Sequence, residues 1–192
     1  MTHSAAHLPF PNLSSVSTDD TAAARSAVSY LIDCGHRSLA VIGGVVEKSE
    51  ISRLRLQGCE QAVEQAAEDV RCVYEPSRFS FQSGYDAMAR LLDRAEEPVT
   101  AVFAMADVLA VGAMRCIRDR GLQVPEDISV VGFDGMSIGR YYCPRLTSVY
   151  QKADQLAEES VALLVDALHG APACHKTTPY ELVPLESVKD CI

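Results

Sequence analysis

The chain has 192 residues, 48% hydrophobic and 22% charged, which is typical of a globular protein with a full core. Its formal net charge of −9 argues against a broad nucleic-acid-binding surface, because phosphate neutralisation needs clustered lysine and arginine. The longest apolar runs are far too short to span a bilayer, and the first residues lack the pattern of a secretion signal. We therefore expect a cytoplasmic protein.

Cysteine usage fits a reducing compartment. The seven cysteines are odd in number and scattered, and no C-x-x-C pair suggests zinc or redox chemistry. We expect free thiols, because buried cysteine in such a compartment acts as a small hydrophobic residue. Metal-ligand spacing and the two common glycine-rich nucleotide-binding motifs are missing from the sequence, so we expect no metal and no cofactor.

In chain order, 13–17 is compatible with a short strand, and a helix is predicted over 21–34, with Gly35 as its stop. Four apolar runs follow, each β-branched or aromatic and each ending in a polar or glycine-rich turn. Their starts lie about 30 residues apart, the length of one βαβ unit, and segments with helical spacing separate them. The runs are Leu39 to Ile42, Val70 to Tyr74, Val99 to Ala104 and Ile128 to Phe133. This alternation predicts an α/β fold with a parallel sheet flanked by helices.

Two more elements are predicted in the last third of the chain. One is a helix near 153–169, and the other is a final strand over 180–187, in which Pro184 favours an edge position. The helices at 21–34 and 153–169 have no obvious partner strand beside them. We expect both to expose apolar surface, which favours self-association.

Candidate ligand residues lie where the predicted strands end, because ligands bind outside the carboxyl ends of parallel strands. These ends carry Gly43–Gly44, the loop 75–81, Met105–Asp107 and Asp134–Gly135. A carboxylate at such an edge can accept hydrogen bonds from sugar hydroxyls or from a ring N–H group. Asp134 has the alternative role of shaping a turn with Gly135, and Asp107 is expected first of all to cap the helix that it opens.

Four further side chains invite a structural or a functional interpretation. Arg55 is either a solvated helix charge or an inward-facing fork for a pair of hydroxyls. Phe79 and Phe81 are either core residues or, for one of them, a surface on which a sugar face stacks. His36 follows a helix stop, and we expect it to hold that turn without a catalytic role.

The segment GMSIG, residues 135–139, matches the G-x-S-x-G motif of serine hydrolases and follows a strand. Its context argues against an enzyme. A nucleophile elbow places the serine on the strand-to-helix turn with a helix behind it, whereas Ser137 lies four residues beyond Phe133 and Pro144 interrupts the segment soon after. His169 and His175 lie downstream, so the order of a triad is kept, but short motifs often match by chance.

Several segments, taken in order, resemble one family. CGHRSLAVIGG, SRLRLQGCEQAV, TAVFAMADVLAVGAMRCIRDRGLQVPEDISVVGFDG and YYCPRLTSVYQ closely resemble the effector-binding region of LacI/GalR-type bacterial transcription repressors. The likeness runs from about Val16 to Ser187. It is specific, because the V-P-E-D-I-S-V-V-G-F-D and P-R-L-T-S-V blocks occur together downstream of the A-D-V-L-A helix start.

The resemblance implies a periplasmic-binding-protein-like fold of type I, in which two α/β lobes are joined by three crossing strands. It implies one complete C-terminal lobe and fragments of an N-terminal lobe, so that the chain looks N-terminally truncated. The expected division is a remnant of the N-terminal lobe over 1–34, the C-terminal lobe over 35–150, a helix returning to the N-terminal lobe over 151–178, and a final strand with the tail over 179–192.

The family's ligand-binding positions carry over onto particular residues here. Arg55, the second arginine of R-L-R-L-x-G, resembles the clamp on ligand hydroxyls, and Asp134 resembles the carboxylate that reaches the ligand from a strand end. Gln151 resembles a hinge-side contact, and Phe79 falls where the family often places a stacking aromatic residue. Asp107 is retained as cap, contact or both. The family usually has asparagine directly before it, and Ala106 at that position puts a common hexose ligand in doubt.

The resemblance implies the ligand-sensing domain of a repressor that binds a small sugar or nucleobase-like effector between two lobes, forms a homodimer, and contacts DNA only through a headpiece absent from this chain. We expect weak or no effector binding by this chain alone, and no operator binding, because most partners from the other lobe are missing. The alternatives are a solute-binding protein of the same fold for transport or chemotaxis, for which an export signal would be expected, and a serine hydrolase using Ser137.

Overall fold

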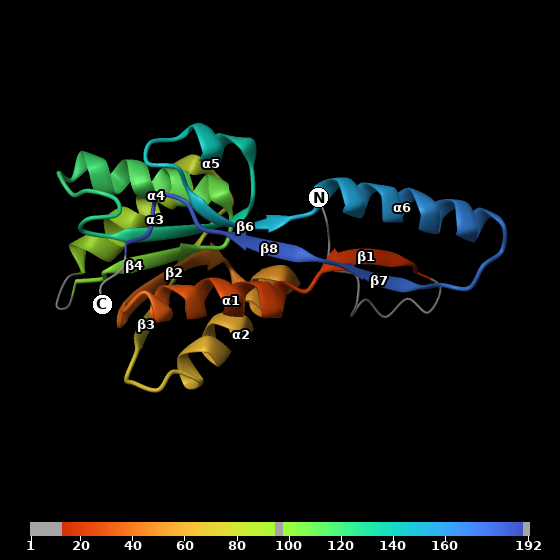
Figure 1. Cartoon of the computed structure of the whole chain (residues 1–192), viewed down its shortest axis with the longest axis horizontal. Coiled ribbons are helices and arrows are strands. Elements are labelled where there is room, and N and C mark those ends of the chain that lie inside the picture. The colour runs from red at the N-terminus through yellow and green to blue at the C-terminus, as the bar shows by residue number, and fades with distance from the viewer. Residues whose placement is uncertain (1–12, 95–97, 190–192) are drawn as a thin grey trace.

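The structure is a computed structural model, shown in Figure 1, and it describes residues 13–94 and 98–189. The described elements are β1 (Ser15–Thr18), α1 (Asp20–Asp33), β2 (Ser38–Gly44), the 3-10 helix η1 (Val46–Lys48), α2 (Glu50–Glu64), β3 (Arg71–Ser77), α3 (Phe81–Asp93), β4 (Ala101–Ala104), α4 (Asp107–Asp119), β5 (Ser129–Asp134), α5 (Ser137–Tyr141), β6 (Thr147–Gln151), α6 (Ala153–Leu168), β7 (His175–Thr178) and β8 (Tyr180–Val183). The four apolar runs and the five helices predicted from the sequence are all present.

A six-stranded sheet forms the centre of the larger part of the molecule, which we call the main body. Its strand order is β3-β2-β4-β5-β6-β8, and every pair is parallel except β6 with β8. The predicted α/β class with a parallel sheet is therefore confirmed. The last strand lies at the edge of the sheet and stops at Val183, so that Pro184 follows it without having to donate a ladder hydrogen bond.

Helices cover both faces of this sheet, with α1 and α2 on one face and α3 and α4 on the other (Figure 1). Neighbouring strand residues point to opposite faces, so Val102 packs under α3 and α4 while Phe103 packs under α1 and α2. This double burial explains why the strands read as continuous apolar runs. Phe133 faces the α1 and α2 side, where the guanidinium of Arg55 from α2 packs on its ring.

The position of α1 corrects the predicted division of the chain. Most of its apolar residues are fully buried in the core that α1 shares with α2, and the helix packs on the main sheet; they are Ala23, Ala24, Ala27, Val28 and Leu31. The boundary expected after residue 34 therefore lies too late for this helix, and the expected exposure of its apolar face is wrong. The segment is helical as expected, but periodicity does not say which sheet a helix covers.

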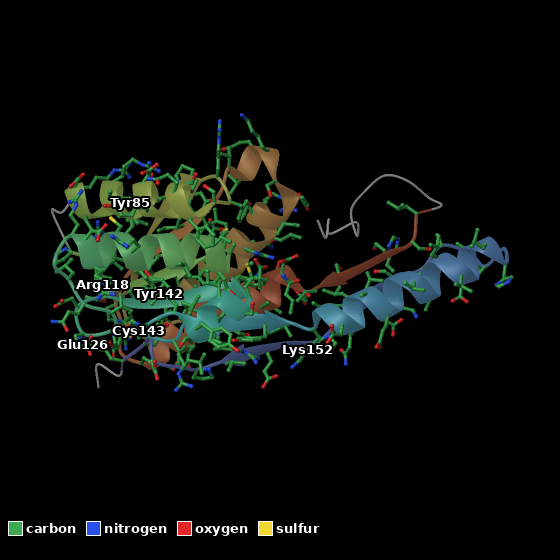
Figure 2. All side chains as sticks on the ribbon, turned by 90° about the horizontal axis from the view of Figure 1, so that it is seen from above. Tyr85, Arg118, Glu126, Tyr142, Cys143 and Lys152 are labelled. Atoms are coloured by element: carbon green, nitrogen blue, oxygen red, sulfur yellow. The ribbon has the colours of Figure 1, made fainter. Side chains whose placement is uncertain are left out.

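A smaller part, which we call the arm, projects from the main body (Figure 1). It consists of β1, α6 and β7, and β1 pairs with β7 in parallel, with Thr18 opposite Thr178. The chain passes between arm and body three times: after β1, after β6 and before β8. Figure 2 shows Lys152 at the second of these passages, at the root of α6. These three connections agree with the three crossing strands implied by the resemblance.

The outer face of α6 is apolar and exposed, as its sequence predicted. Its exposed members are Val161, Leu164, Val165 and Leu168, of which Leu168 is 77% exposed. An exposed row of this kind on one helix is typical of a surface that packs against something else. None of the described helices is both long enough and apolar enough to cross a membrane.

At the amino ends of the strands, His36 is buried and has a structural role, as expected. Its Nδ1 lies 3.0 Å from the Thr100 hydroxyl oxygen and its Nε2 lies 2.9 Å from the Ser129 hydroxyl oxygen. The ring therefore joins the segments that lead into β2, β4 and β5. Burial lowers the pKa of His36, so the neutral ring is the form that fits this place.

Candidate functional site

The carboxyl ends of β2, β4, β5 and β6 meet at one edge of the sheet, because these strands are parallel. The chain leaves β6 at this edge to enter the arm, so the edge faces the arm. We call it the site edge and define it by the residues Gly43, Gly44, Met105, Asp134 and Gln151. Four of the predicted site residues lie on it or beside it.

Arg55 reaches the site edge from the second turn of α2 and is only 5% exposed. Its Nε donates to Asp20 Oδ1 at 2.8 Å, and its Nη1 donates to the Met105 carbonyl oxygen and lies 3.9 Å from Asp134 Oδ1. The guanidinium carbon lies 3.6 Å from the centroid of the Phe133 ring. The side chain is thus an inward-facing fork, and the alternative of a solvated helix charge is wrong.

Asp20 is a member of this cluster that the sequence analysis missed. It is the first residue of α1 and is buried, while its neighbour Asp19 caps the helix by accepting from the Ala22 amide. Burial raises the pKa of Asp20, and the nearby Arg55 opposes that rise. The tandem Asp19-Asp20 before an alanine run was a usable signal, because only one of two adjacent carboxylates can cap a helix.

Asp134 shapes a turn, one of the two roles considered for it, and its carboxylate also lies in the cluster around Arg55, while its contact with a ligand stays a prediction. Its backbone has φ of 106° and that of Gly135 has φ of 70°, so the two residues do form a left-handed turn. Its carboxylate also faces Arg55 and accepts a 2.8 Å hydrogen bond from Gln151 Nε2. Burial raises the pKa of Asp134, while Arg55 and Gln151 favour its charged form. A strained residue that is not glycine is more typical of a functional position than of a simple turn.

Gln151 connects this cluster to the arm. Its Nε2 donates to Asp134, and its Oε1 accepts a 3.1 Å hydrogen bond from the Thr18 hydroxyl at the end of β1. One side chain therefore links two of the three passages between arm and body with the carboxylate of the site. The hinge-side ligand contact that the resemblance implied for Gln151 stays a prediction.

Phe79 lies beside the site edge at Gly44 and is 46% exposed. A Cβ atom added at Gly44 would lie 2.8 Å from the Phe79 ring and 2.3 Å from Ser52 Oγ, so the glycine allows both side chains to approach. Phe79 and Phe81 are both too exposed to be core residues, so the Phe79 ring is partly open to solvent. Glu75, by contrast, lies within β3 rather than in a loop, and its buried carboxylate is paired with the exposed side chains of Arg90 and Arg94.

Asp107 does not cap α4, and this expectation is corrected. The capping position is Ala106, which makes no side-chain hydrogen bond, and Asp107 is the first helical residue. Its carboxylate is fully buried, accepting from the Ser148 hydroxyl at 2.6 Å and from the Met136 amide at 2.5 Å. The helix turns Asp107 inward, behind the site edge, so it is not placed to contact a ligand directly.

Among the residues that the structure describes, no histidine is hydrogen-bonded to Ser137 as a serine hydrolase would require. This serine is exposed at the start of the short helix α5, and His175 of the arm lies 2.8 Å from the Ser15 hydroxyl instead. In the part of the chain that the structure describes, no group of three or more histidine, cysteine or acidic side chains could hold a metal ion.

Taken together, the site edge and the side chains beside it offer one buried guanidinium, two carboxylates, an amide and an exposed aromatic ring. The cluster contains two carboxylates, Asp20 and Asp134, but only one cation, Arg55. Carboxylate oxygens therefore remain that can accept hydrogen bonds from hydroxyl or N–H groups of a ligand. An aromatic face beside such acceptors suits a sugar or a flat heterocycle.

Residues 28–188 match the model of a family described as the periplasmic binding protein-like domain. The chain belongs to this family. The fold expected for the family, with three passages between the main body and a second part, is the fold described above.

Named relatives of this periplasmic binding protein-like domain are transcriptional repressors. The chain is 36% identical over 147 residues to the HTH-type transcriptional repressor PurR of Haemophilus influenzae (strain PittEE), covering 74% of this chain and 42% of that protein. It is 37% identical over 163 residues to the repressor CytR of Escherichia coli (strain K12), covering 84% and 47%. The chain therefore spans less than half the length of these curated relatives.

Among solved structures, a LacI family transcriptional regulator of Enterococcus faecium with bound ribose matches with a TM-score of 0.84 and 30% identity, covering 93% of this chain and 66% of that one. The likeness to LacI/GalR effector-binding regions that the motifs indicated is thus confirmed. The relatives named here are repressors rather than enzymes, which agrees with the arrangement around Ser137.

Proposed function

We propose that this chain is the ligand-sensing part of a LacI/GalR-type transcriptional repressor, and that it binds a small sugar or nucleobase-like effector at the site edge, between the main body and the arm. The observation that carries this proposal is the cluster around Arg55. Asp20 and Asp134 share its guanidinium, and Gln151 extends the cluster to the arm. A ligand that displaced the Gln151 hydrogen bond would act on site and hinge together.

Each proposed contact has a chemical reason. Arg55 donates in a planar fork that matches a pair of hydroxyl oxygens, and Asp134 accepts from hydroxyl or ring N–H groups. Phe79 offers its face to a sugar or a base. Asp107 contributes to ligand binding only indirectly, because its carboxylate is buried behind the site edge. No cofactor is needed for this function.

We assign operator contact to a headpiece outside this sequence and expect the sensor to act as a homodimer. The excess of acidic residues gives the chain a net charge of −9, which makes it a poor partner for DNA by itself. The exposed apolar row on α6 supports self-association.

The test is an NMR titration of the chain with D-ribose, cellobiose and adenosine. We expect weak binding, with Kd in the millimolar range, because the described polar groups lie mostly on the side of the main body. The amide signals that shift should be those of Gly43, Gly44, Asp134 and Gln151. Asp134→Asn should weaken binding by at least about tenfold, since a lost charged hydrogen bond costs about 1.5–3 kcal/mol, which corresponds to roughly 10- to 150-fold in Kd.

Asp119→Asn is the matched control, because Asp119 lies on the last turn of α4, forms its ion pair with Arg115 and interacts with Tyr85 rather than with any residue of the site edge. It should leave the titration unchanged. Shifts confined to other surfaces, or equal affinities in Asp134→Asn and wild type, would contradict the proposed site.

A further inference from the structure

We propose that Asp107 is a positioning residue for the site edge: its buried carboxylate, directly after β4, bonds to Ser148 of β6 and to the turn after β5, and thereby holds the turn that presents Asp134. This inference deepens the proposed function and rests on it for its biological meaning, but its structural content can be tested without any ligand.

The position of Asp107 is unusual for a carboxylate. It is fully buried at the start of α4, directly after the end of β4, and no ion pair to it is found among residues 13–94 and 98–189. Buried carboxylates are normally paired or hydrogen-bonded, because an uncompensated buried charge is costly. Its hydrogen-bond partners must therefore explain why it is there.

The first partner is Ser148, the second residue of β6. Its hydroxyl donates to Asp107 Oδ1 at 2.6 Å, and Ser148 lies opposite Gly132 in the register of β5 and β6. A Cβ atom at Gly132 would lie only 2.3 Å from Asp107 Oδ1. The missing side chain of Gly132 thus makes the space that the carboxylate fills.

The second partner is the turn after β5. Asp107 Oδ2 accepts from the Met136 amide at 2.5 Å, and the Gly135 amide is also oriented to stabilise the charged carboxylate. These two amides directly follow Asp134, whose φ of 106° is strained for a residue other than glycine. Such a conformation persists only where its surroundings fix it, and the bonds to Asp107 fix its following peptide groups.

The carboxylate is also poised between its two protonation states. Burial raises the pKa of Asp107 to about 7, the hydrogen bonds from Ser148 and Met136 oppose that rise, and the charge of Asp134 adds to it. Within the described structure, Asp134 is the charged group that acts on Asp107. When Asp107 is ionised it accepts charge-assisted hydrogen bonds, which are about twice as strong as neutral ones.

The substitution Asp107→Asn would imitate the neutral acid, because the new amide oxygen can accept from Met136 while the new NH₂ group points to Ser148. The experiment therefore compares wild type with Asp107→Asn by amide hydrogen exchange at Met136, corrected for the intrinsic exchange rate, from about pH 5.5 to about 8.5. We expect the ratio of wild-type to variant protection to rise about fivefold across this range, as charge-assisted bonds replace neutral ones. Asp119→Asn, a carboxylate change on the same helix, should follow wild type at every pH.

A second variant keeps the proposal testable if Asp107→Asn does not fold. Ser148→Ala removes a hydrogen bond that lowers the pKa of Asp107, so the midpoint of the Met136 protection profile should move to higher pH. A protection ratio independent of pH, or an unmoved midpoint in Ser148→Ala, would overturn the positioning role. Because exchange is measured without ligand, this outcome is separate from failure of the sugar and nucleoside titration.

Discussion

Removing the guanidinium of Arg55 is the sharpest test of the buried cluster. Arg55→Met keeps much of the length of the side chain and of its contact with the Phe133 ring, but it leaves Asp20 without its 2.8 Å partner. Arg55 and Asp20 are 7% and 6% exposed at their side chains, so water cannot replace the lost bond.

The expected loss in the free energy of unfolding is about 3–5 kcal/mol, the usual cost of leaving one member of a buried pair uncompensated. With a urea dependence of about 2 kcal/mol/M, the midpoint of urea unfolding should fall by about 2 M. In the double variant Arg55→Met/Asp20→Asn the buried charge is gone, so about half of the loss should be recovered.

The pH dependence of the stability of Arg55→Met gives an independent check on the proposed role of the Asp20 charge. A carboxyl group whose folded pKa is raised destabilises the fold as pH rises from its unfolded pKa toward its folded pKa, because the unfolded chain gives up the proton more easily. Without Arg55, the pKa of Asp20 should rise further. The loss in the free energy of unfolding of Arg55→Met relative to wild type should thus be largest at neutral pH and become smaller toward about pH 4. A loss below about 1 kcal/mol, or a double variant less stable than Arg55→Met, would refute the reasoning.

Three further outcomes are expected. Gly44→Ala should cost about 1–3 kcal/mol of stability, because its Cβ would lie 2.3 Å from Ser52 Oγ, and thermal unfolding would show a lower Tm; an unchanged Tm would mean that the site edge relaxes freely. His36→Gln should flatten the fall in stability of wild type below about pH 6.5, since the lowered pKa of this histidine stabilises the fold only while the ring is neutral; parallel pH profiles in urea unfolding would argue otherwise. Leu164→Gln combined with Leu168→Gln should shift sedimentation toward the monomer without lowering Tm, and unaltered sedimentation would exclude α6 as the contact surface.

The sequence predicted the sheet well because its signals were local and redundant. Each buried parallel strand is an unbroken apolar run, and the run from Ile128 to Phe133 coincides with β5 within one residue at each end. The placement of α1 was harder, because an amphipathic helix buries the same face whichever sheet it covers. The strand β7 was missed because HKTT carries almost no apolar signal, and it pairs only with β1, which is remote in the sequence.

The candidate site residues differ in the same way: some have local sequence signals, and others depend on packing between distant segments. Arg55 and Asp134 could be predicted because each lies at a recognisable strand end or motif, and the structure brings them within 3.9 Å of each other. The inward orientation of Asp107 could not be predicted, since it depends on Gly132 and Ser148 of two later strands. Three-dimensional packing decided whether that carboxylate would cap a helix or cross to another strand.

The segment that follows β8, after the chain has returned from the arm, stabilises the main body. After β8, the Ser187 hydroxyl donates to the Val130 carbonyl oxygen and accepts from the Thr147 amide, so it bridges β5 and β6 from inside. We therefore expect removal of the residues that follow β8 to weaken the junction of β5 and β6, while the pairing of β1 with β7 in the arm keeps its own bonds. Residues near the carboxyl end of the sequence thus hold together two central strands of the main sheet.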